Sequence, residues 1–227
     1  MIESKELISK YKKDGFVIIQ NVLESNEVKD LRNHLEEKFS IKINKDLRQV
    51  YSEDVIKDEK FYSVFLRNKL IDSCKIIFGE NFNIIPDFMI QINSFGLSRK
   101  GYKFGWHVDS ASEGNAEYLL KDNYKFAKMG IFLQDNTIEY GGGINISPGS
   151  HKIYFKFFPK NIVFFIKKIQ NKINSVFNNY FVKSKAGDVI IFDSRILHAS
   201  SLPKLNKKNN KLSLNSSVIN KIDGLGE

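Results

Sequence analysis

Residues 186–200, AGDVIIFDSRILHAS, place a strand pattern directly before a histidine. The apolar run within DVIIF, bounded by turn residues, is typical of a buried β-strand. A short turn follows this run, so His198 is expected at the mouth of the strand. A histidine in that place is a candidate metal ligand.

The neighbouring sequence predicts more strands of the same kind. Short apolar runs separated by turn residues occur at 82–95, 126–135, 142–150 and 211–219. Helical patterns come earlier in the chain, at 3–13, 25–39 and 60–79, with Ser25 as a candidate cap of the second helix. Helices followed by strands predict an antiparallel β-core with helices packed on it.

Size and composition favour one soluble domain over residues 1–227. The chain has 42% hydrophobic residues and a formal net charge of +9. The charge favours anionic partners, although a general bias toward Lys, Asn, Ile and Phe explains it equally well. Cys74 has no second cysteine to pair with, and neither a signal peptide nor a membrane span is visible. We therefore expect a cytoplasmic protein without an obligate protein partner or nucleic acid.

A second candidate for metal binding lies in FGWHVDSAS, residues 104–112. On a strand, His107 and Asp109 point to the same side and can hold one ion. One imidazole and one carboxylate bind a metal weakly, so a third ligand is needed, and His34, His151 and His198 are the remaining imidazoles. Two histidines and one carboxylate on one face suit a non-haem Fe(II) oxygenase.

Four blocks together resemble the phytanoyl-CoA dioxygenase family of Fe(II)/2-oxoglutarate oxygenases. They are YKKDGFVIIQNVLESNEVKDLRNHLEE at 11–37, FGWHVDS at 104–110, MGIFLQDNTIEYGGGINISPGSHK at 129–152, and the opening block at 186–200. The resemblance implies a double-stranded β-helix, also called a jelly roll and similar to the cupins, with flanking helices. It implies a single enzyme domain that hydroxylates an unactivated C–H bond, using Fe(II), 2-oxoglutarate and O₂.

The resemblance also assigns residues. It makes His107, Asp109 and His198 the iron ligands, and it makes His151 a structural residue of the Pro-Gly-Ser-His turn. The family holds the far carboxylate of 2-oxoglutarate with an arginine after the last histidine. Here Lys211 occupies that place, with Ser213 as its hydroxyl partner.

Two further residues are candidate contacts of the co-substrate, and one run of glycines is a candidate turn. Gln91 points toward the barrel by strand alternation and is a further co-substrate contact. Lys208 is the second candidate for the counter-charge. The run Gly141–Gly143 predicts a hairpin turn, because it lacks the context of a phosphate-binding loop.

Other functions stay open at this point. A non-catalytic metal-binding jelly roll has the same ligands, and so does a zinc hydrolase. A halogenase on this fold would lack the carboxylate ligand, which Asp109 supplies. The primary substrate is expected to be a small molecule.

The segment at about 160–180 predicts an inserted amphipathic helix. Residues 152–183 contain seven lysines and no acidic residue. The helix is expected either to pack on the barrel, or to form a lid that favours an anionic or lipid-like substrate, or to make peripheral contact with a membrane.

Overall fold

The structure is a computed structural model of residues 1–227. It describes residues 2–40, 48–50, 52–92, 105–109, 126–139, 143–152, 165, 169, 172–174, 176–201 and 211–220. The helices are α1 (Ile2–Asp14), α2 (Ser25–Lys38), α3 (Ser52–Ile56), α4 (Glu59–Tyr62), the 3-10 helix η1 (Ser63–Leu66) and α5 (Asn68–Phe78). The candidates Lys208, Gly141 and Gly142 lie outside the described residues.

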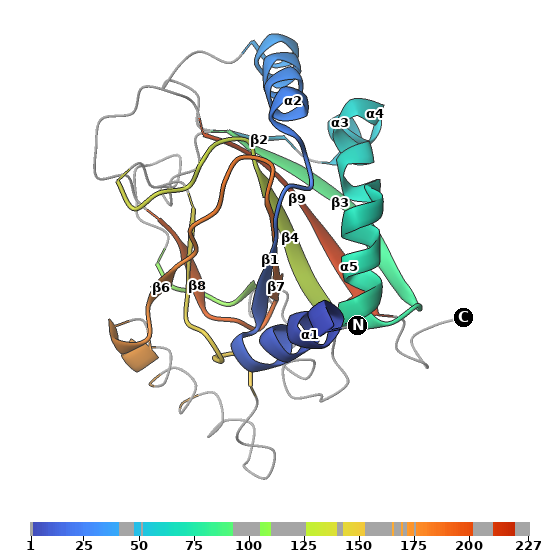
Figure 1. The fold of residues 1–227 in the computed structure, drawn as a ribbon. Helices are drawn as coiled ribbons and strands as arrows, with labels where there is room; N and C mark the ends of the chain where they lie inside the picture. Colours follow the sequence, from blue (N-terminus) through green and yellow to red (C-terminus); the bar gives the residue numbers. More distant parts are fainter. Residues whose placement is uncertain are drawn as a thin grey trace.

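The strands form two antiparallel sheets. They are β1 (Phe16–Ile19), β2 (Arg48–Val50), β3 (Phe82–Ile92), β4 (Phe126–Phe132), β5 (Ile144–Ile146), β6 (Tyr180–Phe181), β7 (Val189–Asp193), β8 (His198–Ser200) and β9 (Leu212–Asn220). The larger sheet has the order β1-β7-β4-β9-β3-β2, and the smaller sheet has the order β6-β5-β8. Figure 1 shows the smaller sheet on one side of the larger sheet and the helices on the other. The predicted jelly roll with flanking helices is confirmed.

The larger sheet is covered on both of its faces, and β7 illustrates why. Val189 and Ile191 belong to the hydrophobic cluster shared with the helices. Ile190 and Phe192 belong to a second cluster, which also contains Ile146 of the smaller sheet. Because successive side chains of a strand point to opposite faces, both sets of side chains from Val189 to Phe192 must be apolar.

In β9 the two faces differ in chemistry. Leu212 and Leu214 join the helix-side cluster, while Lys211 and Asn215 line a pocket between the sheets. The pattern KLSLN therefore buries leucines on one side and gives the pocket polar side chains on the other.

Two details of the helices correct the expectations from sequence. The prediction that Ser25 caps the second helix is wrong, because Ser25 is the first residue of α2 and Glu24 is its N-cap. The carboxylate of Glu27 accepts the Glu24 backbone N–H at 2.9 Å. The prediction of a single helix at 60–79 is also wrong, because α4, η1 and α5 occupy this region. Arg67 is extended there (φ −61°, ψ 132°) and separates η1 from α5. The guanidinium of Arg67 lies 2.6 Å from the carboxylate of Glu27, which links this break to α2.

No helix among the described residues has the length and apolar character needed to cross a membrane.

Gly187 joins the larger sheet to the segment before α2. Its carbonyl accepts the backbone N–H groups of Val22 and Leu23, each at 3.1 Å, and its own N–H donates to Phe132 at 2.9 Å. Its φ is +89°, and a Cβ on it would lie 2.4 Å from the Leu23 carbonyl oxygen. Backbone conformation and space both require glycine at this position.

We expect Gly187→Ala to reduce the free energy of unfolding by clearly more than Gly79→Ala. Gly79 has nearly the same φ, +88°, but has nothing within 4 Å of a built Cβ. The positive φ alone costs about 1–3 kcal/mol in each variant, and only Gly187→Ala adds a clash with backbone. Urea unfolding of both variants measures the difference. Equal losses of stability would show that the contact with Leu23 relaxes without cost.

Candidate metal centre

Two backbone hydrogen bonds hold His107 against His198. The His107 N–H donates to the His198 carbonyl at 2.9 Å, and the His198 N–H donates to the His107 carbonyl at 3.0 Å. His198 is the first residue of β8, and β8 is held in turn by β5 through the pair Ile146–His198. The smaller sheet therefore fixes the position of both histidines.

Asp109 completes a cluster of three. Its Oδ1 atom lies 3.5 Å from the Nε2 atom of His107 and 3.5 Å from the Nε2 atom of His198. One ligand atom from each residue lies within 4.8 Å of the others. The structure thus brings together the three residues that the sequence predicted as ligands, although they come from segments about ninety positions apart.

Both imidazoles present the same nitrogen to the cluster. The Nδ1 atom of His107 lies 3.0 Å from the Gly105 carbonyl oxygen, and that of His198 lies 3.1 Å from the Ile196 carbonyl oxygen. A carbonyl oxygen only accepts, so each Nδ1 carries the proton that it donates, and in the neutral ring each Nε2 has a lone pair for a metal ion. Metal-binding histidines are usually oriented by such a second hydrogen bond.

The electrostatics favour the cation-binding forms of Asp109 and His198, but they favour the protonated form of His107. Burial would raise the pKa of Asp109, but the hydrogen bond from His107 and the charges of His198, His107 and Lys128 hold that pKa below its usual value. Burial lowers the pKa of His198 more than the nearby Asp109 raises it. The hydrogen bond with Asp109 raises the pKa of His107 more than burial lowers it. Among the three candidate ligands, His107 is therefore the one at which protonation competes most strongly with metal binding.

The three residues fit a divalent transition metal. Ligand bonds of about 2.1 Å place neighbouring donor atoms roughly 3 Å apart, so the 3.5 Å separations need only a small contraction. Two imidazoles and one carboxylate on one side leave the other positions for exogenous ligands. The His107 side chain is 46% exposed and that of His198 only 9%, so the open side lies toward His107.

An ion pair between Asp193 and Arg195 stabilises the turn before His198. Both carboxylate oxygens of Asp193 accept from the Arg195 guanidinium, at 2.9 and 2.7 Å, and Asp193 Oδ1 also accepts the Arg195 backbone N–H. The Ser150 hydroxyl oxygen accepts the Leu197 N–H at 2.8 Å. Arg195 is therefore part of the structure that positions His198 and is not a free surface charge.

The two other histidines lie elsewhere. His34 on α2 contacts Asp58 at 2.9 Å. His151 is buried against Gly15, where a built Cβ would lie 2.4 Å from its Nδ1 atom. Neither belongs to the His107–Asp109–His198 cluster.

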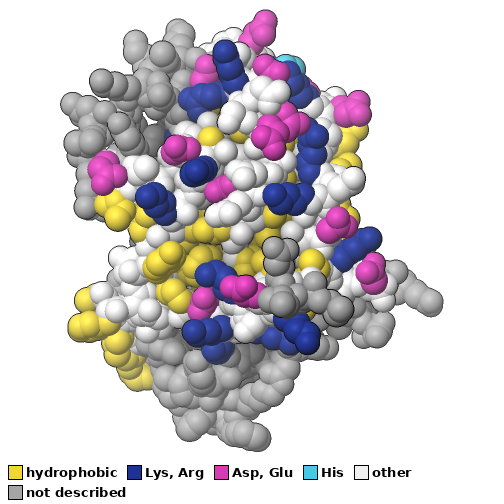
Figure 2. Space-filling model, viewed as in Figure 1, with side chains coloured by type: hydrophobic (Ala, Val, Ile, Leu, Met, Phe, Trp, Pro, Cys, Tyr) yellow, Lys and Arg dark blue, Asp and Glu magenta, His cyan; other side chains and the backbone are white. Residues whose placement is uncertain are grey.

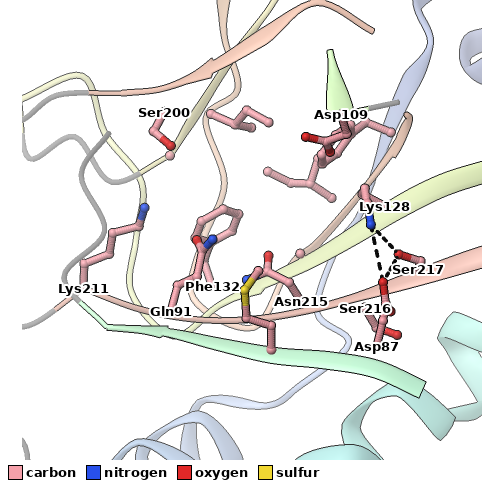
Figure 3. Close-up of a pocket in the computed structure, with 16 residues that line it drawn as sticks. Asp87, Gln91, Asp109, Lys128, Phe132, Ser200, Lys211, Asn215, Ser216 and Ser217 are labelled. Carbon is pink, nitrogen blue, oxygen red and sulfur yellow. Dashed lines mark hydrogen bonds and ion pairs between the residues drawn. The ribbon is translucent and has the colours of Figure 1, made fainter. Parts of the chain in front are cut away.

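A pocket of about 280 Å³ extends from Asp109 into the space between the sheets. Figure 3 shows Lys211 at one end of it, with Asp87, Asp109 and Lys128 at the other and with Gln91 and Asn215 between them. Ser213, two residues after Lys211, lies on β9 and pairs with Gln91 of β3 in the strand register. The predicted residues Lys211 and Gln91 thus both line the pocket.

A polar group beside Asp109 was not predicted from the sequence. Lys128 on β4 donates to the Ser217 hydroxyl at 2.9 Å and lies 3.4 Å from the Asp87 carboxylate, and Ser217 also donates to Asp87 (Figure 3). The position of Lys128 within the otherwise apolar run FAKMGIF could have indicated that this side chain has a role in the pocket. Strand alternation places Lys128 on the same side as Gly130 and Phe132, which line the pocket.

A family model described as Phytanoyl-CoA dioxygenase (PhyH) matches residues 11–202. The chain belongs to the phytanoyl-CoA dioxygenase family. The match includes all four blocks identified in the sequence, whereas Lys211 and Ser213 lie beyond it. As a member, the chain is an enzyme of the Fe(II)/2-oxoglutarate oxygenase class that also uses O₂, and the predicted family and cofactors are confirmed.

Three solved structures share the fold of this family member. The non-heme alpha ketoglutarate dependent epimerase SnoN of nogalamycin biosynthesis is 13% identical, with a TM-score of 0.70 over 100% of this chain and 90% of SnoN. The carbocyclase SnoK is 18% identical, with a TM-score of 0.67 over 95% of this chain and 84% of SnoK. EctD from S. alaskensis with bound Fe is 16% identical, with a TM-score of 0.66 over 95% of this chain and 76% of EctD. No curated protein sequence matches significantly.

We expect alanine at His107, Asp109 or His198 to abolish stoichiometric Fe(II) binding, because two ligands of this kind hold the ion weakly. Metal analysis after anaerobic loading and desalting measures the loss independently of turnover. His34→Ala is the matched control, since His34 lies on α2 and contacts Asp58. Retention of one Fe(II) per chain by His198→Ala would exclude His198 as the third ligand.

Proposed function

We propose that this family member hydroxylates an unactivated C–H bond of a small molecule, with iron held by His107, Asp109 and His198. The main supporting observation is that Asp109 of this triad lines one end of a pocket whose opposite end holds the buried Lys211. That arrangement suits a co-substrate with one end on the metal and an anionic group at the far end.

Bound Fe(II) supplies the activation of O₂ that C–H oxidation requires, and the chain supplies binding and orientation. Asp109 provides the negative charge of the donor set, and the two imidazoles bind through Nε2 because their Nδ1 protons are donated to carbonyl groups. The bridge between His107 and His198 keeps both rings in place before any ligand enters. The site therefore needs little rearrangement on loading.

Lys211 is the proposed partner of the far carboxylate of 2-oxoglutarate. It is 4% exposed, and its Nζ atom lies 5.8 Å from the centroid of the Phe132 ring. A carboxylate taken into a buried pocket needs a paired cation. Two further buried groups lie along β9 and have no hydrogen-bond partner among the described residues, the Ser213 hydroxyl and the Asn215 side-chain nitrogen. Both suit an oxygen-rich ligand, and Gln91 lies across from Ser213.

Lys128 is the competing cation in the same pocket, and its contacts favour a different role. It already donates to Ser217 and lies beside Asp87, so its charge is largely compensated. It is also at the same end of the pocket as Asp109 (Figure 3). We therefore assign Lys211 to the co-substrate and the Asp87–Lys128–Ser217 group to a polar part of the primary substrate.

The pocket volume supports a substrate that enters only in part. Small-molecule pockets commonly measure about 300–1,000 Å³, and this one, at about 280 Å³, must also contain the co-substrate. We expect the reacting end of the primary substrate to enter and the remainder to stay outside. An anionic or lipid-like molecule with a polar group near the oxidised carbon fits this description.

We expect the enzyme to work in the cytoplasm, where a lone thiol stays reduced. Burial raises the pKa of Cys74 to about 12, so this thiol is also unreactive.

We expect Lys211→Met to raise the KM for 2-oxoglutarate by roughly ten- to a hundredfold, with Fe(II) binding unchanged. The loss of a hydrogen bond to a charged group is worth about 1.5–3 kcal/mol. Lys211→Arg should retain most of the affinity, because the charge remains. Succinate release at varied 2-oxoglutarate measures the effect.

Lys128→Met is the matched control for this assignment. It removes the other pocket lysine and should leave the KM for 2-oxoglutarate within about twofold, while substrate-stimulated turnover falls. A large rise in that KM for Lys128→Met, with little change for Lys211→Met, would exchange the two roles.

The proposed hydroxylation is tested with ¹⁸O₂. The Fe(II)-loaded enzyme is given 2-oxoglutarate and a panel of fatty acids, acyl thioesters and amino acids, and succinate is measured. We expect one class to stimulate succinate release and to gain one ¹⁸O atom in the product, detected by mass spectrometry. Substrate-stimulated succinate release with a product that contains no added oxygen would rule out hydroxylation while preserving the oxygenase class.

A further inference from the structure

Five large apolar side chains between residues 165 and 177 face solvent. All five are helical, and their spacing of three or four positions places them on one side of a helix. We call this set the apolar stripe; it consists of Phe165, Ile169, Ile173, Val176 and Phe177. Their exposed fractions range from 46% at Ile169 to 84% at Phe177.

This exposure is concentrated in one part of the protein. Among the described residues, nine large hydrophobic side chains are exposed, and six of these are the apolar stripe and Tyr180. Hydrophobic side chains are visible at the lower left edge of Figure 2, below the position of β6 in Figure 1. Contiguous exposed apolar side chains commonly mark an interaction surface.

The expectation that this apolar face packs on the barrel is therefore wrong for the five stripe residues. The amphipathic pattern predicted which side of the helix is apolar, but it did not predict what this side contacts. Lys167 and Lys168 lie outside the described residues. Lys172 is exposed next to Ile173.

The charges around the apolar stripe indicate the partner. Residues 152–183 contain seven lysines and no acid, and Lys172 and Lys183 are both exposed. A second copy of the chain would bring the same lysines and its own net charge of +9 to the contact. A surface of negative charge with an apolar interior satisfies both the lysines and the apolar stripe.

We propose that the apolar stripe, with Lys172 and Lys183, docks on the surface of an anionic lipid bilayer. The phenylalanines and aliphatic side chains enter the boundary between headgroups and acyl chains, and the lysines contact the anionic headgroups.

The docking face is connected to the metal centre through the smaller sheet. Tyr180 of β6 pairs with Ile146 of β5, and Ile146 pairs with His198. The apolar stripe ends three residues before Tyr180, so docking brings the metal centre close to the membrane surface. Docking does not depend on the proposed reaction, and it adds a source for a lipid-like substrate.

The test is co-sedimentation of the full chain with vesicles of phosphatidylcholine alone or with phosphatidylserine added. We expect binding to the anionic vesicles only. Ile173→Ser with Phe177→Ser should weaken binding at least about tenfold, and so should Lys172→Glu with Lys183→Glu. Because the four positions are exposed, both variants should retain the circular dichroism and Fe(II) binding of the wild type.

Matched controls change the same residue types elsewhere. Ile56→Ser with Leu66→Ser removes two other exposed apolar side chains, and Lys29→Glu with Lys57→Glu reverses two other exposed lysines. Both controls should bind vesicles like the wild type.

Three outcomes overturn the proposal: no vesicle binding at low ionic strength, equal loss in the controls, or self-association that the Ile173→Ser, Phe177→Ser variant abolishes. Vesicle binding is measured without 2-oxoglutarate or O₂. Its failure is thus distinct from a failure of the hydroxylation assay.

Discussion

The larger sheet is covered on both faces, and this constraint determines where every other element lies. One face must be apolar to hold the helices, while the other must include a pocket that admits polar ligands. Only the two-residue period of a strand lets one segment serve both faces. Leu212 and Leu214 of β9 stabilise the fold, while Lys211, directly before the strand, and Asn215 supply the pocket. Stability and ligand binding are therefore encoded in alternate residues of one strand.

Local pattern made much of this predictable from sequence. Strand alternation indicated that His107 and Asp109 point the same way, and the run DVIIF placed His198 at the mouth of a strand. The same alternation put Gln91 on the pocket side, whereas Lys211 was predicted from the resemblance to the family. The inferences from strand patterns need only the backbone geometry of short segments, which the sequence specifies well.

The remaining features depend on contacts between distant segments. The group Asp87–Lys128–Ser217 joins three strands, and only the register of β4 and β3 against β9 brings it together. The division of the 60–79 region follows an extended residue, Arg67, whose partner Glu27 lies on another helix. The amphipathic pattern at 165–177 predicted an apolar side but could not tell whether protein or solvent lies against it.

The pocket contains the buried Lys211 at one end and the carboxylate of Asp109 at the other, and together they affect the net charge of the loaded site. When Fe(II) and the dianion of 2-oxoglutarate are bound as proposed, the two positive charges of the metal and the one of Lys211 balance the dianion and Asp109. The contacts between Lys128 and Asp87 add no net charge. Counted over the pocket residues that the structure describes, the charges then sum to zero, and a neutral set avoids most of the cost of burying charge. A free metal ion beside Asp109 and Lys211 leaves an excess of positive charge, so metal and dicarboxylate should each strengthen the binding of the other.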